Sequence, residues 1–395
     1  MHAMQPQQES RHQPLQAMQL VLWLSVLTDH QIHTFRALQE LLGQPIHFVV
    51  GFRRLADRTS QGWCEPELED LSVETLPKRG WCRFGCRVLE RYPHAIHIFG
   101  GLWADRRFFP LLLLAQRRSI STALMMESFA DVAQSYFRDQ PGPIDALKSV
   151  LRPLAYKLAG RLVARRLCAA FPISDKAVGQ LKAMGTPVNR IFPFGYFVPS
   201  ISADNPDQEE LKSKAFRLVF VGSLIARKGL LTLTESVTRL RAEGHEVELD
   251  VYGPGDASQL ESNGIRYCGV IPFGRAQQVI RAYDLLVLPS LHDGWGVVVN
   301  EALIQGVPAL VSDACGAKTL VEVSGAGSIF QAGCAEDLMR VLRELFDPVR
   351  LADCQRNARA YGPQLDPVLA ANQLHQCLLS VADPQITLPL SPWYS

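Results

Sequence analysis

The sequence lacks several features that define large classes of proteins. Its apolar runs, such as 18–27 and 111–115, are well short of the roughly 20 residues that a membrane-spanning helix needs. Its nine cysteines are scattered, and the closest pair, Cys82 and Cys86, has no His or Cys cluster nearby to complete a metal site. No Gly-x-Gly-x-x-Gly motif follows the first strand-like run of either half, which argues against a nicotinamide dehydrogenase.

We expect no signal peptide at the start of this sequence. Residues 1–16 are polar and rich in Gln, without the basic segment and cleavage site of a signal peptide. Because the unpaired cysteines also suit a reducing compartment, we expect a cytoplasmic protein. Any contact with the inner face of the plasma membrane is expected to be peripheral.

Charge is divided unevenly along the chain, although the formal net charge is only +1. Residues 1–197 contain 24 basic and 16 acidic residues, a net of +8, whereas residues 198–395 contain 16 and 23, a net of −7. A basic N-terminal half suits an anionic membrane surface or an anionic acceptor, and ordinary solubility charge is the alternative. Nucleic acid is not among the partners that we expect.

Both halves of the chain alternate apolar strand-like runs with helical segments. The strand-like runs lie at 20–24, 46–50, 95–99, 120–126, 216–221, 247–252, 265–268, 285–288 and 309–311. Most of them end in small or polar residues, which is typical of open parallel sheets whose ligand edge lies at the strand C-termini. We therefore predict an α/β protein made of two doubly wound, Rossmann-like domains that face a central cleft.

A change of composition marks the boundary between the two domains. Residues 198–214 are rich in Ser, Asp, Pro and Glu and have no periodicity, as in a linker. We place a first domain at 1–197 and a second domain at 215–365. Residues 366–395 form a last helix and a tail, and because no strand follows them we expect this helix to pack back on the first domain.

One helical segment of the first domain, 151–170, is both basic and apolar. Its basic residues are Arg152, Lys157, Arg161, Arg165 and Arg166, set among Leu, Ala and Val. Such a helix suits the surface of an anionic membrane. The alternative is a solvent-facing helix packed on its own sheet.

Two acids follow the apolar run at 285–288. Asp293 and Glu301 lie eight positions apart around a glycine-bracketed turn, and we predict a helix that begins near Val297. Its free N–H groups and its dipole favour phosphate, and a carboxylate accepts two hydrogen bonds from a vicinal diol. One acid can therefore hold a sugar and the other a ribose, with the diphosphate between them. Three consecutive valines at 297–299 favour a strand instead, and a similar turn occurs in any doubly wound domain.

Further motifs occur in a fixed order between 216 and about 345. They are Val221-Gly222, Lys228-Gly229, Tyr252-Gly253-Pro254-Gly255, Tyr283-Asp284, Pro289-Ser290, the spaced acids and Gly306-Val307-Pro308. With this order the second half resembles the retaining family 4 glycosyltransferases of the GT-B fold, the glycosyl transferases group 1. Weaker similarity extends through the first half, including 191–196. Chains of this type are found in bacterial surface-polysaccharide and lipopolysaccharide assembly.

The resemblance implies that 1–197 is an acceptor-side domain and that 215–365 is a nucleotide-sugar-binding domain, with the donor site in this second half. Arg227 and Lys228 match the basic residues that bind the donor diphosphate, and Glu301 matches the acid that holds the donor ribose. Asp293 stands where the family usually has Glu, so its reach to the sugar is one methylene shorter. The other donor-binding residues that the resemblance implies are Gly222, Ser223, where many relatives carry Arg, Ser290, Gly294, Trp295, Gly296, Val297 and Val298.

The first half departs more from the family pattern. Many relatives carry His-x-His after the strand at 95–99, whereas here His97 is followed by Phe99, so the second His is missing. The candidates for contact with the acceptor or the reacting sugar are Glu127, His30, Gly100 and Gly101. A capping carboxylate and a surface histidine are the alternatives for the first two, while the glycines bring backbone close to a ligand.

We therefore expect an enzyme that moves a hexosyl group from a nucleoside diphosphate sugar to a hydroxyl of a glycan or lipid-linked acceptor. The resemblance implies retention of configuration. No Asp-x-Asp follows a buried strand, so we expect a metal-independent reaction with no cofactor, in which Arg227, Lys228 and the helix start stabilise the leaving diphosphate. A nucleotide-sugar epimerase or hydrolase and a non-catalytic GT-B subunit are the alternatives.

Overall fold

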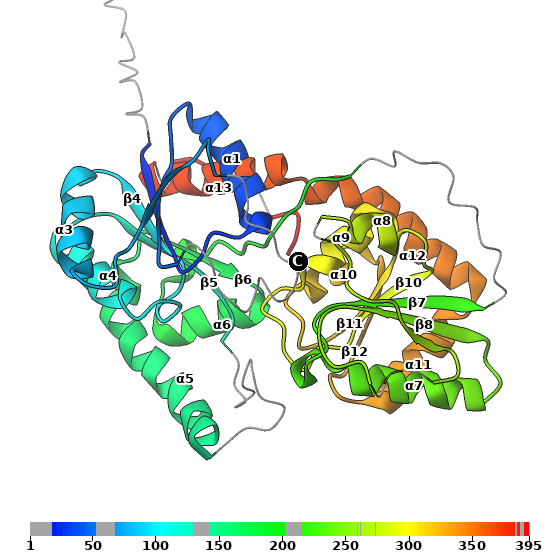
Figure 1. The fold of residues 1–395 in the computed structure, drawn as a ribbon. Helices are drawn as coiled ribbons and strands as arrows, with labels where there is room; N and C mark the ends of the chain where they lie inside the picture. The colour runs from blue at the N-terminus through cyan, green and yellow to red at the C-terminus, as the bar shows by residue number, and fades with distance from the viewer. Residues whose placement is uncertain are drawn as a thin grey trace, which may run out of the picture.

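The protein consists of two lobes, each built on a six-stranded parallel sheet with flanking helices (Figure 1). This computed structural model describes residues 18–52, 68–129, 143–201 and 215–394, apart from 259, 261, 273, 384 and 388–390. The predicted α/β fold with two doubly wound halves is confirmed. Most of the predicted linker, 202–214, lies outside the described residues.

The N-terminal lobe has the strand order β3-β2-β1-β4-β5-β6. Its strands are β1 (Leu20–Leu24), β2 (His47–Val50), β3 (Ser72–Thr75), β4 (Ile96–Phe99), β5 (Thr122–Glu127) and β6 (Ala169–Ile173). Its helices are α1 (Asp29–Leu42), α3 (Trp81–Arg91), α4 (Phe108–Arg117), α5 (Pro143–Val163) and α6 (Asp175–Met184). All five residues of β1 are apolar and buried, as expected for a central strand covered on both faces.

The C-terminal lobe repeats this topology with the strand order β12-β11-β10-β7-β8-β9. Its strands are β7 (Phe216–Val221), β8 (Val247–Tyr252), β9 (Ile265–Tyr267), β10 (Leu285–Leu288), β11 (Ala309–Ser312) and β12 (Gly327–Phe330). Its helices are α7 (Leu230–Ala242), α8 (Ala276–Ile280), α9 (Val297–Ile304), α10 (Lys318–Ser324), α11 (Ala335–Leu345) and α12 (Pro348–Tyr361). In each sheet the chain order reverses between two neighbouring strands, β1 and β4 or β7 and β10, which is where ligands bind in doubly wound folds.

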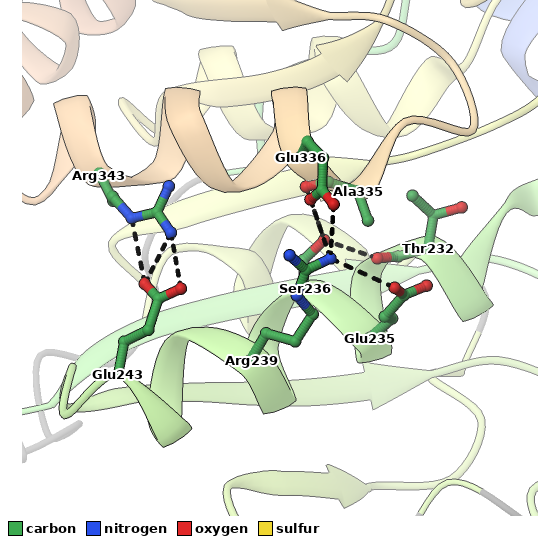
Figure 2. Close-up of polar contacts among 8 residues, drawn as sticks. All are labelled: Thr232, Glu235, Ser236, Arg239, Glu243, Ala335, Glu336 and Arg343. Carbon is green, nitrogen blue, oxygen red and sulfur yellow. Dashed lines mark hydrogen bonds and ion pairs between the residues drawn. The ribbon is translucent and has the colours of Figure 1, made fainter.

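Helices α7 and α11 lie side by side on the C-terminal lobe, joined by the polar contacts in Figure 2. The buried Ser236 hydroxyl donates to the Thr232 carbonyl at 2.8 Å and to the Ala335 carbonyl at 3.3 Å. Around it, Arg343 pairs with Glu243 at 2.6 Å. Because exposed ion pairs contribute little, the apolar contacts between the helices supply most of the packing energy.

The last helix, α13 (Pro367–Ala382), crosses back and packs against α1 of the N-terminal lobe. Its start is fixed by the Asp366 side chain, which accepts from the Val368 N–H, and by Pro367 in the first turn. Beyond α13, the buried Trp393 ring packs on Phe197 with ring centres 4.2 Å apart. The end of the described chain therefore lies between the lobes.

Several predicted boundaries agree with the structure, and one prediction is wrong. Strands β7, β8 and β10 have the predicted limits, and α9 begins at Val297. The predicted helix at 151–170, however, ends at Val163, is followed by a 3-10 turn, and its last two residues lie in β6. Ala169 and Ala170 favour a helix by intrinsic propensity. The sheet buries them on both faces, however, and burial overrides this local preference.

Candidate functional site

The candidate site lies at the switch point of the C-terminal sheet, where the segments after β7 and β10 meet. Gly229 follows β7 with φ of 67°, and a methyl group at its α-carbon would collide with the Pro289 carbonyl after β10. Only glycine combines this left-handed backbone with such close approach. The basic pair and the first acid are thereby brought side by side.

Lys228 and Asp293 form an ion pair at the centre of this site. The Lys228 Nζ donates to the Asp293 Oδ2 at 2.6 Å, and the two side chains are only 16% and 12% exposed. Ser290, which is buried, donates its hydroxyl to the same oxygen at 3.4 Å. Burial alone would raise the pKa of Asp293, but the positive charges of Lys228 and Arg227 outweigh burial and hold that pKa below its usual value.

Arg227 is buried, and its guanidinium Nη1 donates to the His292 carbonyl at 2.6 Å. Its own carbonyl accepts from the Leu291 N–H at 2.8 Å. Arg227 therefore ties the segment after β7 to the segment after β10. Lys228 is the member of the basic pair that reaches the predicted sugar-binding acid.

Helix α9 begins directly after the turn, at the predicted residue. Its first turn contains Val297 and Val298, and Gly296 stands before it with φ of 99°. A side chain at Gly296 would crowd Leu288 and Cys315, so the turn requires glycine. No side chain caps this helix start, which leaves its N–H groups and its dipole available to an anion.

Glu301 lies in the second turn of α9 and is partly buried. Burial, with a smaller contribution from the Asp29 charge, raises its pKa to about 7. Within the described part of the chain, its carboxylate has no hydrogen-bond partner. Since Asp29 belongs to α1, this acid faces the N-terminal lobe, and its unsatisfied oxygens are suited to a ligand that donates hydrogen bonds.

Across from this turn, three residues of the N-terminal lobe form one polar cluster. The Tyr196 hydroxyl donates to the Glu127 Oε1 at 2.7 Å, and the His30 ring lies 4.5 Å from the Tyr196 ring. A side chain at Gly294 would collide with the Glu127 carboxylate. Two of the predicted acceptor-side residues, Glu127 and His30, are thus joined to each other and to the acidic turn.

Tyr196 was not predicted as a site residue. It was visible in the sequence only as part of the motif at 191–196, ahead of the linker. The sequence signal that could have identified Tyr196 as a site residue is a polar aromatic side chain next to Gly195 in this motif. Its contact partners are His30, 166 residues away in sequence, and Glu127, 69 residues away, so no local pattern reveals them.

Two other predicted residues, Trp295 and Gly222, use hydrogen-bonding groups within the protein. The Trp295 side chain is buried, and its Nε1 donates to the Asn300 Oδ1 at 2.9 Å, while Asn300 donates to the Tyr196 carbonyl at 3.0 Å. Only the backbone of Trp295 therefore borders the predicted donor site. The Gly222 N–H donates to the Tyr252 carbonyl at 2.9 Å, and the partly buried Ser223 follows it.

Gly100 and Gly101 follow β4 beside β1. The Gly100 N–H donates to the Trp23 carbonyl at 2.7 Å, and no described contact joins either glycine to the cluster of Glu127, Tyr196 and His30. Upstream, Trp23 donates its Nε1 to the His97 Nδ1 at 3.1 Å, so the other nitrogen of His97 donates to the Tyr92 carbonyl at 2.9 Å. Burial lowers the pKa of His97 to about 4, and it is a neutral core residue.

A pocket of about 550 Å³ opens at the other end of α9. Its lining includes Ile304, Gln305, Arg359 and Asp366. None of the predicted site residues lines it, so it does not belong to the candidate site. Among the described residues, no three His, Cys, Asp or Glu side chains gather as a metal site requires, and no helix there is long and apolar enough to cross a bilayer.

Comparison with known proteins finds a family match within the C-terminal lobe. Residues 215–347 match the family described as Glycosyl transferases group 1. A putative teichuronic acid biosynthesis glycosyltransferase of Bacillus subtilis, TuaC, is 29% identical over 155 residues, which cover 38% of this chain and 39% of that protein. A phosphatidyl-myo-inositol mannosyltransferase of Mycobacterium leprae is 25% identical over 212 residues, or 51% and 54% of the two chains. The chain thus spans about half or less of the length of these relatives.

Solved structures resemble the protein over nearly its whole length. HepE of Anabaena, crystallised with UDP and glucose, has a TM-score of 0.64 at 14% identity and covers 92% of this chain and 99% of its own. WaaG, a glycosyltransferase involved in lipopolysaccharide biosynthesis, has a TM-score of 0.60 at 18% identity, with coverage of 90% and 98%. At such identities the similarity shows the fold. The predicted GT-B fold and the resemblance of the C-terminal half to group 1 glycosyltransferases are confirmed.

Proposed function

We propose that the protein is a glycosyltransferase that moves a hexosyl group from a nucleoside diphosphate sugar to an acceptor hydroxyl, with retention of configuration. The observation that carries the proposal is the contact of Lys228 with Asp293 beside the start of α9. Both residues and Glu301 lie in the segment that matches the family. The named functions of the relatives support a role in surface-polysaccharide or glycolipid synthesis.

In the proposed donor complex, the diphosphate lies against Lys228 and the uncapped start of α9. Without a donor, the Lys228 ammonium group pairs with the Asp293 carboxylate. A bound diphosphate attracts the ammonium group, and the Asp293 carboxylate then accepts hydrogen bonds from sugar hydroxyls. Glu301 accepts from the ribose diol. Arg227 contributes its charge from a buried position rather than through an open guanidinium face. Preorganised positive charge at the leaving group lowers the barrier without a metal.

The acceptor is proposed to approach from the N-terminal lobe. Glu127, held by Tyr196, lies against Gly294 and so borders the position proposed for the sugar. We assign Glu127 to orienting the acceptor hydroxyl or the reacting sugar. In a front-face retaining route the departing phosphate accepts the acceptor proton, so no protein base is required.

The test is a donor screen followed by one substitution. Thermal shift with UDP-, GDP- and ADP-sugars identifies the donor, because a ligand that binds only the native state raises the melting temperature. UDP-glucose is tested first, because HepE was crystallised with it. With that donor, Lys228→Ala should reduce transfer by at least about a hundredfold, as expected for loss of a charge at the leaving group, while the exposed Lys182→Ala leaves it unchanged.

The outcomes separate the competing functions. Near wild-type transfer by Lys228→Ala would sink the proposed site. Consumption of donor without an acceptor indicates an epimerase or hydrolase. Donor binding without turnover under any condition indicates a non-catalytic subunit. Transfer that survives removal of divalent cations with EDTA supports the metal-independent route.

A further inference from the structure

Helix α5 exposes a row of leucines on the surface of the described structure. The row, here called the leucine row, consists of Leu147, Leu151, Leu154, Leu158 and Leu162. Each of these side chains is between 51% and 63% exposed. Isolated exposed leucines are common, but five on one helix are not explained by chance surface composition.

The spacing of the row places it on one face of the helix. Steps of three and four residues, at about 100° per residue, keep all five leucines within a sector of roughly 80°. The face that packs on the lobe is different: Ala159 and Val163 are buried, and Gly160 lies against Met184 of α6. The leucine row therefore lies on roughly the opposite side of α5. Helix α5 itself lies at the outer edge of the N-terminal lobe (Figure 1).

Charge along the same helix is mostly of one sign. Helix α5 and the 3-10 turn that follows it, residues 143–166, contain six basic residues and one acidic residue, Asp145. Those whose side chains the structure describes, Arg152, Lys157, Arg161, Arg165 and Arg166, are all exposed. An exposed apolar row flanked by basic residues is the pattern of a helix that lies in the plane of an anionic lipid surface.

We infer that α5 is a membrane-docking helix whose leucine row inserts among the acyl chains of an anionic bilayer while its basic residues contact the lipid headgroups. A second copy of the chain is the competing occupant, since the leucine spacing also suits helix pairing. The positive charge of the helix favours the anionic bilayer over a second copy. Two copies would bring two predominantly basic helices together, whereas an anionic surface neutralises their positive charge.

Docking through α5 adds a source of the acceptor to the proposed function. A bilayer on the outer edge of the N-terminal lobe brings lipid-linked acceptors to the lobe that contains Glu127. The inference rests on the proposed function only for the use of such acceptors. Vesicle binding is measured without donor or transfer, so either proposal can fail while the other stands.

The experiment uses the full chain with vesicles of phosphatidylcholine alone or with about one third phosphatidylglycerol, in a co-sedimentation assay at low and high salt. We expect binding to the anionic vesicles only, weakened by salt. The triple variant Leu154→Ser, Leu158→Ser, Leu162→Ser should bind at least about tenfold more weakly, because each serine removes an inserting side chain. Leu231→Ser, at a 75% exposed leucine of α7, is the matched control and should bind normally.

A second set of variants tests the charges. Arg161→Gln with Arg165→Gln and Arg166→Gln should also reduce anionic binding by about tenfold, since each basic residue near the surface adds attraction. Arg83→Gln with Arg87→Gln, exposed on α3, removes charge from the same lobe and should have a much smaller effect. Unchanged thermal unfolding of the variants shows that they are folded.

Two results would overturn the inference. Wild-type vesicle binding by the leucine variant would mean that the row does not insert. A dimer in sedimentation velocity that dissociates in the same variant would assign the row to a second copy of the chain.

Discussion

Replacing Glu301 with Gln should make the protein more stable at alkaline pH while leaving it unchanged at acid pH. In the native state, burial and the nearby Asp29 charge raise the pKa of Glu301 from 4.5 to about 7. In the unfolded chain the carboxyl has its ordinary pKa. Between these two values the native state holds a proton that the unfolded state has released, so stability falls as pH rises through this window.

The size of the effect follows from the shift. At about 1.4 kcal/mol per pKa unit, the difference between 4.5 and about 7 corresponds to a loss of about 3 kcal/mol, complete above about pH 8. Gln cannot ionise and does not suffer this loss. Urea unfolding should therefore give equal free energies near pH 4.5 and a free energy that is up to about 3 kcal/mol higher for Glu301→Gln near pH 8.

The charge of Asp29 provides a matched control. Asp29→Asn removes the like charge from the neighbouring lobe but leaves the burial, so the window in which stability falls should narrow without disappearing. If Glu301→Gln and the wild-type protein lose stability in parallel between about pH 5 and pH 8, the carboxyl is not buried as described. A parallel loss would refute the reasoning.

The proposed ribose contact adds a second measurement on the same residue. A diol donates hydrogen bonds to the ionised carboxylate, so donor binding should strengthen as pH rises through about 7. In isothermal titration the dissociation constant of the nucleotide should fall by up to about tenfold per pH unit below that value. Glu301→Gln should bind weakly at every pH, without this dependence.

Three further substitutions test other contacts. Gly229→Ala should lower the free energy of unfolding in urea by at least about 2 kcal/mol, because its methyl group would meet the Pro289 carbonyl at a left-handed backbone position. Tyr394→Phe should cost about 1–3 kcal/mol in the same assay, because the hydroxyl donates to one backbone carbonyl of the N-terminal lobe and accepts from one N–H. Tyr196→Phe should lower kcat more than it changes the donor KM, because it releases Glu127.

Each of these has an outcome that contradicts it. Wild-type stability of Gly229→Ala would mean that the segments after β7 and β10 are farther apart than described, with Gly179→Ala, an open helical position, as the control. An unchanged free energy of unfolding for Tyr394→Phe would mean that the Tyr394 side chain is not docked on the N-terminal lobe. A change confined to donor KM in Tyr196→Phe would assign the tyrosine to the donor rather than to Glu127.

Strands and their ligand edge could be predicted from the sequence because burial on both faces leaves continuous apolar runs. The limits of β7 and β10 agree for this reason. Val297 to Val299 form a helix despite their strand propensity, because Gly296 turns the chain and the sheet provides an apolar surface for α9. Here the glycine pattern was more informative than residue propensity.

Pairings across long sequence separations could not be predicted. Lys228 and Asp293 were assigned to different parts of the donor, and their mutual ion pair depends on how closely two loops approach. The cluster of Glu127, Tyr196 and His30 and the buried position of the Trp295 ring have the same origin. Such contacts depend on how segments that are distant in sequence approach one another in the folded chain, which no local pattern encodes.

The crossing of α13 has a consequence for the order in which the protein assembles. Its packing against α1 means that the N-terminal lobe is completed by residues synthesised after the whole C-terminal sheet. During translation, the apolar surface of α1 that α13 covers stays open until the C-terminal sheet has been made. The first lobe to begin folding is therefore finished only after the second, and its stability depends on a segment that follows the second lobe.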